Sequence, residues 1–301
     1  MMKEEPILVA IQCFVYNHEP YLRDCLEGFV MQKTNFRFVA VVHDDASTDK
    51  SADIIREYEA KYPDIIIPIY ETENQYSKHN GSITRIMNEA IDATGAKYIA
   101  MCEGDDYWTD PYKLQKQVDF LESHPDFVAC FHNARVFNGQ YYRLFNSVNE
   151  NHFPTTDDLI LRRWFIATPT LMYRNIIKLY PKWAHEVVNG DYLLELLLAR
   201  EGKFYYMDDA MSVYRQEGQG LSCKLNAHKL DLYDKLIFLL SSMKEMYPVQ
   251  YADTFDQSIT NYQQMKADYQ KEIFYAKHPL LRAFRMKTYK RAIKQWLRRK
   301  M

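Results

Sequence analysis

The stretch Cys102-Glu103-Gly104-Asp105-Asp106-Tyr107-Trp108 places three carboxylates within four residues. Residues 97–100 before it predict a short buried strand, and Pro111 with apolar residues at helical spacing after it predicts a helix. The three acidic side chains are therefore expected in a strand-to-helix turn. In an open α/β sheet, ligands bind at this edge, where the strands have their carboxyl ends.

Three like charges this close together repel one another unless a cation or hydrogen-bond donors offset them. Oxygen ligands suit Mg²⁺ or Mn²⁺, which usually bind one or two carboxylates together with substrate phosphates. One interpretation of the turn is therefore a metal–diphosphate site. The other is an acidic, solvated turn that precedes a helix. The turn alone does not decide between them.

The part of the chain before this turn alternates between apolar runs and helical patterns. Strands are expected at residues 7–11, 36–42, 65–69 and 97–100, and helices between them at 21–29, 54–58 and 83–91. Pro68 predicts that the third strand is an edge or irregular strand, because proline cannot donate to a sheet. The alternation predicts a parallel sheet with right-handed crossovers.

Two common nucleotide-binding motifs are absent from the sequence. No G-x-G-x-x-G follows the first strand, which argues against a dinucleotide-binding fold. No G-x-x-x-x-G-K-[ST] occurs, which argues against a P-loop. The sheet is therefore expected to bind its ligand by other means.

The part of the chain after the acidic turn predicts a second set of elements. Further strands are expected at residues 126–137, 169–173 and 203–213. The apolar run after Asp191 predicts a buried helix that ends at Gly202. Asp191 would stand at the N-terminus of that helix, where the helix dipole favours a carboxylate. A helix-capping role is therefore the alternative to any catalytic role of Asp191.

Residues 225–301 are predicted to form a separate helical region after a first domain at 1–224. The segment from Lys277 to the end is basic and contains no acidic residue. It predicts an amphipathic helix with Trp296 on its apolar face, which is typical of helices that lie on anionic membranes. The alternative is a terminal helix packed on the protein with a solvated basic face.

The composition limits where the protein works. A formal net charge of -2 gives no sign of a nucleic-acid partner. The five cysteines form no C-x-x-C pair, which favours free thiols in a reducing cytoplasm. The N-terminus lacks the apolar core of a signal peptide, and no apolar stretch is long enough to span a bilayer. We expect a cytoplasmic protein, peripheral on the inner face of the cytoplasmic membrane.

With these segments in place, the sequence resembles the family 2 glycosyltransferases, which are inverting, nucleotide-sugar-dependent enzymes. The resemblance covers roughly residues 5–222, and its motifs occur in the family's order. They are Tyr16-Asn17-His18-Glu19, Asp44-Asp45-Ala46-Ser47-Thr48-Asp49, Glu103-Gly104-Asp105-Asp106, Gly190-Asp191 and Tyr214-Arg215. The resemblance implies an α/β fold of the GT-A type, a Rossmann-like mixed sheet flanked by helices, here with a C-terminal helical extension.

The resemblance also implies a binding site for the donor nucleotide. Tyr16 would stack on the base, taken to be uracil, and Asp45 would accept a hydrogen bond from it. Asn17, Glu19 and Asp105 would complete this site.

The same resemblance implies a metal site and a general base. Glu103, Asp105 and Asp106 match the family's acidic metal motif, in which one aspartate contacts the ribose and the other a Mn²⁺ or Mg²⁺ ion. Asp191 matches the general base that takes the proton of the acceptor hydroxyl. General-base help of this kind contributes about 10²–10⁴-fold to a rate. One base and no enzyme nucleophile imply a single displacement with inversion.

Three positions depart from the family pattern. Phe14 stands where the family often has a small hydroxyl residue, and Glu103 stands where it usually has aspartate. Glu217 stands where a histidine often helps to hold the metal, and we expect its carboxylate to act as the third metal contact.

The resemblance therefore predicts transfer of a sugar from a UDP-sugar to a hydroxyl of a glycan or lipid-linked acceptor, in the synthesis of a bacterial-type surface polysaccharide. The alternative is a catalytically silent scaffold that binds nucleotide sugars, which the departures at Phe14 and Glu217 favour. A nucleotidyltransferase is disfavoured, because the sequence lacks a glycine-rich phosphate loop with Arg or Lys near its N-terminus.

Overall fold

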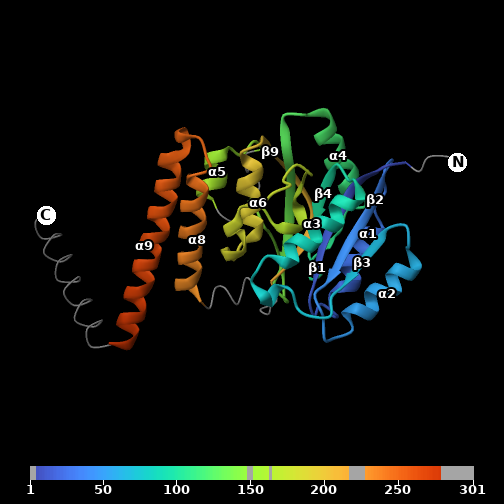
Figure 1. Ribbon diagram of the computed structural model, residues 1–301, viewed down its shortest axis with the longest axis horizontal. Helices are drawn as coiled ribbons and strands as arrows, with labels where there is room; N and C mark the ends of the chain where they lie inside the picture. The colour runs from blue at the N-terminus through green and yellow to red at the C-terminus, as the bar shows by residue number, and fades with distance from the viewer. Residues whose placement is uncertain (1–4, 148–151, 163–164, 217–227, 279–301) are drawn as a thin grey trace, which may run out of the picture. The chain divides into compact units, whose positions relative to one another are not determined.

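The computed structural model describes residues 5–147, 152–162, 165–216 and 228–278. The chain forms two compact units, residues 1–224 and residues 225–301 (Figure 1). Glu217, Cys223 and the basic segment from residue 279 onward lie outside the described residues, so the expectations placed on them stay predictions.

The first unit is built on one mixed sheet with the strand order β3-β2-β1-β4-β8-β6-β9-β5, in which β7 pairs with β6. Its strands are β1 (Ile7–Val15), β2 (Arg37–Asp44), β3 (Ile66–Tyr70), β4 (Tyr98–Met101), β5 (Tyr107–Trp108), β6 (Phe127–Phe137), β7 (Tyr142–Leu144), β8 (Met172–Arg174) and β9 (Lys203–Arg215). β1 to β4 are mutually parallel where they pair, as predicted. β3 lies at the edge of the sheet, where Pro68 requires no donor.

The parallel half of the sheet contains a topological switch point beside β1. The chain passes from β1 outward to β2 and β3, and then returns to β4 on the other side of β1. Val15 at the end of β1 pairs with Asp44 at the end of β2, and Gln12 pairs with Met101 of β4. Loops that leave these strands therefore diverge above β1, and open α/β sheets bind their ligands in the crevice at such a point.

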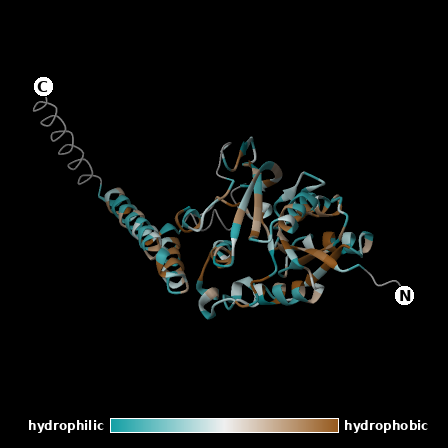
Figure 2. Ribbon diagram, turned by 90° about the horizontal axis from the view of Figure 1, so that it is seen from above, coloured by the Kyte–Doolittle hydropathy of each residue, from teal (hydrophilic) through white to brown (hydrophobic). Residues whose placement is uncertain are grey.

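Helices cover both faces of this sheet, which explains the continuous apolar runs of the strands (Figure 2). On one face the buried residues come from α1 (Leu22–Val30), α2 (Ser51–Lys61) and α4 (Lys113–Ser123). On the other they come from α3 (Ser82–Thr94), α5 (Thr156–Leu161) and α6 (Gly190–Ala199). Each fully buried aliphatic side chain contributes about 1.5–3 kcal/mol, so these two layers hold the sheet rigid beneath the crevice.

Two parts of the first unit differ from the prediction. The acidic turn does not lead directly into a helix, because Tyr107 and Trp108 first form β5, which pairs antiparallel with β9. The predicted strand at 169–173 begins instead as a 3₁₀ turn, Thr168–Thr170, and becomes extended only in β8. Pro169 occupies an early position of that turn, which suits proline because the donor it lacks would have no partner there.

The second unit contains the helices α8 (Lys229–Lys244) and α9 (Ala252–Lys277). The fully buried face of α8 is Leu232, Leu236, Leu239, Leu240 and Met243. In the described ranges, every helix is either too short or too polar to cross a bilayer.

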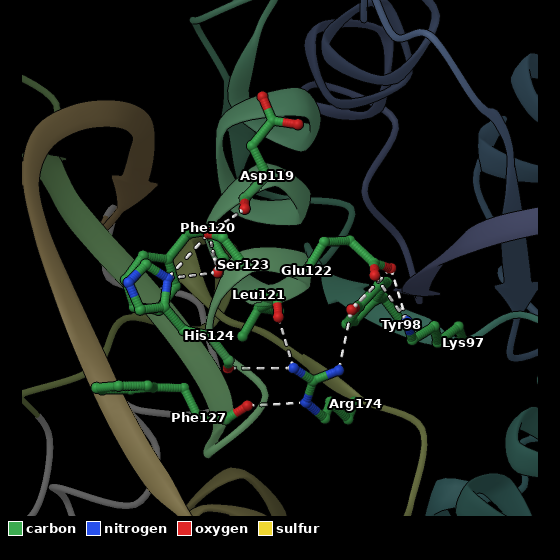
Figure 3. Close-up of polar contacts among 10 residues, drawn as sticks. All are labelled: Lys97, Tyr98, Asp119, Phe120, Leu121, Glu122, Ser123, His124, Phe127 and Arg174. Carbon is green, nitrogen blue, oxygen red and sulfur yellow. Dashed lines mark hydrogen bonds and ion pairs between the residues drawn. The ribbon is translucent and has the colours of Figure 1, made fainter.

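Arg174 at the end of β8 fastens α4 to the sheet (Figure 3). Its guanidinium donates to the carbonyl oxygens of Leu121 (2.6 Å), His124 (3.3 Å) and Phe127 (2.8 Å), and to the hydroxyl of Tyr98 (3.0 Å). Leu121 and His124 end α4, whose carbonyls have no partner within the helix. The far end of α4 is thereby fixed, and its first turn is held next to the acidic turn.

Lys113, the first residue of α4, is a cation inside the core. Its side chain is fully buried, and its Nζ lies 3.9 Å from the centroid of the Trp108 ring. No described residue accepts a hydrogen bond from this ammonium. Burial lowers the pKa of Lys113 to about 7, although the Cys102 and Cys130 thiols act in the opposite direction. The unfolded chain therefore binds this proton more tightly than the native state between pH 7 and the ordinary pKa of lysine near 10.5.

We expect the free energy of unfolding to rise as the pH rises above 7, because the native state then no longer holds a buried charge on Lys113. Lys113→Met should raise the free energy of unfolding by about 3 kcal/mol more at pH 6 than at pH 9. Urea unfolding at both pH values measures this. Lys116→Met, at a partly exposed position on the same helix, should show no such difference. If the Lys113→Met variant is less stable than the wild type at pH 6, the account is wrong.

Candidate functional site

Three loops meet at the carboxyl edge beside β1: residues 16–20 after β1, 45–50 after β2 and 102–106 after β4. The backbone N–H of Asp45 donates to the carbonyl of Val15 at 2.9 Å. On the other side, the backbone N–H of Gly104 donates to the carbonyl of Phe14 at 3.0 Å. The three motifs that lie far apart in the sequence therefore share one edge at the switch point.

Asn17 links the first loop to the second. Its backbone N–H donates to Ser47 Oγ (2.9 Å), and its side-chain Oδ1 accepts from the backbone N–H of Thr48 (2.7 Å). Asn17 itself has a left-handed backbone with φ 57°, which asparagine tolerates better than most residues. The polar atoms of Asn17 thus shape the loop that presents its neighbour Tyr16.

Glu19 makes a second link of the same kind. Its backbone N–H donates to Asp49 Oδ2 at 2.9 Å, and its Oε2 accepts from the backbone N–H of Lys50 at 3.1 Å. Tyr16, which precedes both linking residues, leaves 47% of its surface exposed. The links therefore hold a rigid loop with one open aromatic ring.

Asp45 is buried, and both of its carboxylate oxygens are bound to the loop that follows β3. Oδ1 accepts from the backbone N–H of Gln75 at 2.6 Å, and Oδ2 accepts from that of Tyr76 at 3.0 Å. The Asn74 side chain adds a hydrogen bond to the Asp45 carbonyl at 3.1 Å. Asp45 therefore anchors this loop to the crevice, and any hydrogen bond from a ligand base would use a remaining lone pair.

Gly104 allows the acidic turn to approach the first loop. A Cβ at this position would lie 2.7 Å from His18 Nδ1 and 3.0 Å from Val15 Cγ2. Both distances are shorter than a comfortable contact, so a side chain would push the two loops apart. Glycine is the residue that lets the Gly104 backbone bind Phe14 and brings the acids to the switch point.

The carboxyl of Glu103 is open to solvent but has protein on most sides. Burial raises the pKa of Glu103 to about 8, and the charges of Asp105 and Asp191 act in the same direction. Asp191 therefore lies close enough to Glu103 for their charges to interact, although 88 positions separate them in the sequence. The structure brings the acid at the start of α6 to the acidic turn.

Asp106 and Arg215 lock the acidic turn to the end of β9. Asp106 is buried, and its Oδ1 accepts from the backbone N–H of Arg215 at 2.8 Å. Arg215 Nη1 donates to the Asp105 carbonyl at 2.9 Å, and its guanidinium lies over the rings of Tyr107 and Tyr21. Burial and then the charge of Asp105 raise the pKa of Asp106 well above its ordinary value. Asp106 thus faces inward, and Asp105 stands nearer the open side.

Buried cysteine thiols contact the backbone of the same acidic turn. Cys25 Sγ donates to the carbonyl of Glu103 at 3.4 Å, and Cys102 Sγ lies 3.8 Å from the same oxygen. Cys13 Sγ lies 4.0 Å from Cys25 Sγ. These three thiols and Cys130 are free and buried, as expected for thiols that are structural.

Several buried polar atoms at the crevice have no hydrogen-bond partner among the described residues. They are His18 Nδ1, Asp44 Oδ1, Asp105 Oδ1 and Asp106 Oδ2. Burial raises the pKa of Asp44 and lowers that of His18, while Asp105 raises the pKa of His18. Native proteins rarely leave such atoms unsatisfied, so this group calls for a ligand.

The oxygen atoms of this group suit a hard divalent cation. Within the described ranges, no three His, Cys, Asp or Glu side chains are grouped as a complete metal site. A cation held by one or two carboxylates would be completed by the phosphates of a ligand. The residues that are present therefore fit such a cation.

Asp191 lies in the first turn of α6, next to the helix N-terminus. The N-cap position belongs to Asn189, which makes no side-chain capping bond. Asp191 Oδ1 accepts from the backbone N–H of Tyr192 at 2.8 Å. The helix dipole favours the ionised carboxylate there, as the capping alternative assumed, and the same position brings Asp191 near Glu103.

Sequence reasoning gave no role to four residues that build the site. Gln75 and Tyr76 bind Asp45 through their backbones, and backbone contacts leave no pattern in the side chains. Arg215 was noted only as the end of a motif, because a single arginine at the end of a strand does not reveal its partners. His18 stood in a quoted motif, where its burial against Gly104 could not be seen.

Comparisons with known proteins identify the family of the chain. The family model described as "Glycosyl transferase family 2" matches residues 13–176. An uncharacterized protein of Mycobacterium tuberculosis is 35% identical over 220 residues, which is 71% of this chain and 60% of the relative. A Bacillus spizizenii protein named poly(ribitol-phosphate) beta-glucosyltransferase is 33% identical over 102 residues, 33% of this chain and 15% of that protein.

Two solved structures share the architecture. One is S. aureus TarS 1–349 in complex with UDP-GlcNAc, with a TM-score of 0.57, 18% identity and coverage of 88% of this chain and 92% of that one. The other is the mannosyltransferase PcManGT from Pyrobaculum calidifontis in complex with GDP-Man and Mn²⁺, with a TM-score of 0.57, 15% identity and coverage of 85% and 70%. At these identities the likeness confirms the predicted fold class.

Proposed function

Since the chain belongs to glycosyltransferase family 2, we propose that it transfers a sugar from a UDP-sugar to a hydroxyl group of a glycan or a lipid-linked acceptor. The observation that supports this proposal is that Asp191 lies near enough to Glu103 for its charge to raise the pKa of that carboxyl. A base at Asp191 would then be close to the edge where a nucleotide sugar would bind. Residues 1–224 would contain the whole reaction.

The donor nucleotide would lie across the loops that follow β1 and β2. The exposed Tyr16 ring offers a face on which uracil can stack, and Asp105 would contact the ribose or the diphosphate. Asp45 would accept a hydrogen bond from the base through a remaining lone pair. Asn17 and Glu19 would act through the loop shape that they fix. TarS, which was crystallised with UDP-GlcNAc, supports the choice of a UDP-sugar.

A divalent cation, Mn²⁺ or Mg²⁺, would be held by Asp105 and Glu103 together with the donor diphosphate. When bound, it would neutralise the charge that grows on the leaving diphosphate. Asp106 would keep the turn in place through Arg215, and Glu217 would supply a further contact. Support comes from the unpartnered Asp105 Oδ1 and from PcManGT, which was crystallised with Mn²⁺.

Asp191 would accept the proton of the acceptor hydroxyl. The acceptor oxygen would form its bond to the anomeric carbon while the bond from that carbon to the diphosphate oxygen breaks. One base and one displacement give inversion at that carbon. The acceptor would belong to a surface polysaccharide of a bacterial type, as the relative named for poly(ribitol-phosphate) suggests.

The basic segment 279–301 would hold the protein on the inner face of the cytoplasmic membrane. Its lysines and arginines would meet anionic headgroups, and Trp296 would enter the interface. The lipid-linked form of the acceptor would then be within reach.

Asp191→Asn should lower sugar transfer by at least about 100-fold, because the acceptor hydroxyl loses its base. UDP release from UDP-GlcNAc and other UDP-sugars with glycan acceptors measures this, and UDP affinity should stay unchanged. Asp53→Asn, on the exposed surface of α2, is the control. Normal turnover by the Asp191→Asn variant would overturn the mechanism. A wild type that binds UDP but consumes no UDP-sugar would favour the silent scaffold instead.

UDP should raise the thermal midpoint of unfolding more with Mn²⁺ than with a chelator, because a ligand that binds the native state stabilises it. Asp105→Asn should remove the part of the UDP-induced shift in the thermal midpoint that depends on Mn²⁺. Asp106→Asn should weaken the Mn²⁺-dependent part of the shift less than Asp105→Asn, since Asp106 Oδ1 already accepts from the backbone N–H of Arg215 and only Oδ2 is left for the ion. Equal UDP shifts with Mn²⁺ and with a chelator would refute the metal site.

Deletion of residues 279–301 should release the protein from vesicles that contain anionic lipid, as measured by co-sedimentation. Each basic residue near such a surface contributes about 1 kcal/mol, so the full-length chain should also dissociate at high salt. Sedimentation that the deletion leaves unchanged would exclude the anchor.

A further inference from the structure

The hairpin of β6 and β7 stands on the side of β6 that faces the crevice. β9 pairs with β6 along one edge, so β8 and β7 share the other edge. β8 pairs with residues 129–130 of β6, and β7 pairs with residues 135–137, nearer the carboxyl end. β8 also pairs with β4, the strand that leads into the acidic turn. β7 therefore lies above β8, on the side of β4 and its turn.

The end of β9 joins this hairpin to the acidic turn. The backbone N–H of Gln216 donates to the carbonyl of Phe137, the last residue of β6, at 2.8 Å. The preceding residue, Arg215, donates from its backbone N–H to Asp106 Oδ1 and from Nη1 to the Asp105 carbonyl. These hydrogen bonds connect the hairpin to the turn that would hold the cation and the diphosphate.

One face of the hairpin carries exposed apolar side chains. Phe137 pairs with Tyr142, and their rings stack with 4.7 Å between the centroids. Arg135 pairs with Leu144, and both stand two residues from that aromatic pair, so the four side chains share one face of the sheet. Tyr142 is 54% exposed and Leu144 is 41% exposed. We call these four residues the hairpin face.

The hairpin face lies on the side of the sheet that α6 covers. Alternate residues of a strand point the same way, and the extra residues in the pairing of β6 with β9 lie in β9, so Arg135 and Phe131 share a side of β6. Phe131 is buried together with Leu194 and Leu198 of α6. α6 leads through a short loop into the start of β9, at the edge opposite the crevice. Asp191, at the other end of α6, therefore lies at the crevice edge and on the side of the hairpin face.

Arg135 brings a positive charge to this face. Its side chain is exposed, and among the described residues none forms an ion pair or a hydrogen bond with its guanidinium. The guanidinium of Arg215, in contrast, binds the Asp24 carboxylate and the Asp105 carbonyl. The charge of Arg135 is therefore open to an anion from outside the protein.

We propose that the hairpin face binds the acceptor glycan and that this glycan is acidic, with its anionic group at Arg135. This inference rests on the proposed function. The apolar C–H face of a sugar ring can stack on Tyr142, which combines an apolar ring with a polar tip. The planar guanidinium of arginine binds phosphate or carboxylate through paired hydrogen bonds. A sugar chain that carries anions matches both features of the face.

The place of the hairpin in the sheet favours the acceptor over the donor. The donor nucleotide would lie across the loops after β1 and β2, whereas β7 lies on the other side of β4. Asp191, the base for the acceptor hydroxyl, is on the side of the hairpin face. A glycan on this face would reach the acidic turn over the end of β9.

Saturation-transfer NMR in saturating UDP and Mg²⁺ can measure the affinity of three sets of probes. They are the 1-phosphates of glucose, galactose and N-acetylglucosamine, the glucuronic and galacturonic acids, and the neutral methyl glycosides of the same three sugars. At least one acidic probe should bind the wild type more tightly than its neutral counterpart, and the kind of acid identifies phosphate or carboxylate. Arg135→Gln should weaken that probe by about tenfold or more, equivalent to about 1.4 kcal/mol, and leave the neutral probes unchanged. Tyr142→Ala should weaken acidic and neutral probes alike.

Two control variants are matched to these substitutions. Arg143→Gln removes the same charge from the opposite face of the hairpin, because Arg143 pairs with Val136. Tyr112→Ala removes a ring of similar exposure, since Tyr112 is 48% exposed and lies beside Lys33. Neither control should change the affinity of any probe, and UDP affinity should be equal in all variants.

The proposal is overturned if acidic probes bind the wild type no better than neutral ones, or if Arg135→Gln keeps the preference for acidic probes. It is also overturned if Tyr142→Ala binds the probes like the wild type. Acidic probes whose binding depends on Arg135 and Tyr142, in a protein that never consumes a UDP-sugar, would refute the transferase and leave the acidic-glycan site standing.

Discussion

The crevice depends on the close approach of two backbones, at Gly104 and at Phe14. Their hydrogen bond continues the pairing of β4 with β1 beyond the sheet, and it can form only because residue 104 has no Cβ to meet His18 and Val15. The approach carries the acids of the turn to the switch point. The loop links made by Asn17 and Glu19, and the lock between Asp106 and Arg215, hold the two sides of this contact.

The acids of the motifs divide into two groups by what they touch. Asp45 and Asp106 are buried and bound to backbone N–H groups, so they hold the loop after β3 and the end of β9 in place. Glu103 and Asp105 stand on the open side, where burial together with like charges raises the pKa of Glu103 to about 8. Such repulsion costs stability unless a cation or donors offset it, and this cost is what makes the site ready to bind a charged ligand.

The parallel half of the fold could be predicted from the sequence, because strands covered on both faces leave continuous apolar runs and each helix repeats its apolar residues. Pro68 even indicated the edge strand. β5 and β7 were missed because two or three residues show no alternation. Within the site, the acidic turn was visible as a cluster, but the bond between Asp45 and the Tyr76 backbone was not. A carboxylate has the same appearance in a sequence whether it binds a ligand or a loop.

The most direct test of the account is a crystal structure of the protein with UDP and Mn²⁺. We expect the uracil ring against Tyr16, the ion between the diphosphate and Asp105, and the Asp191 carboxylate facing the same crevice. UDP bound elsewhere, or an Asp191 that points away from the nucleotide, would contradict the central claim that these loops form one site.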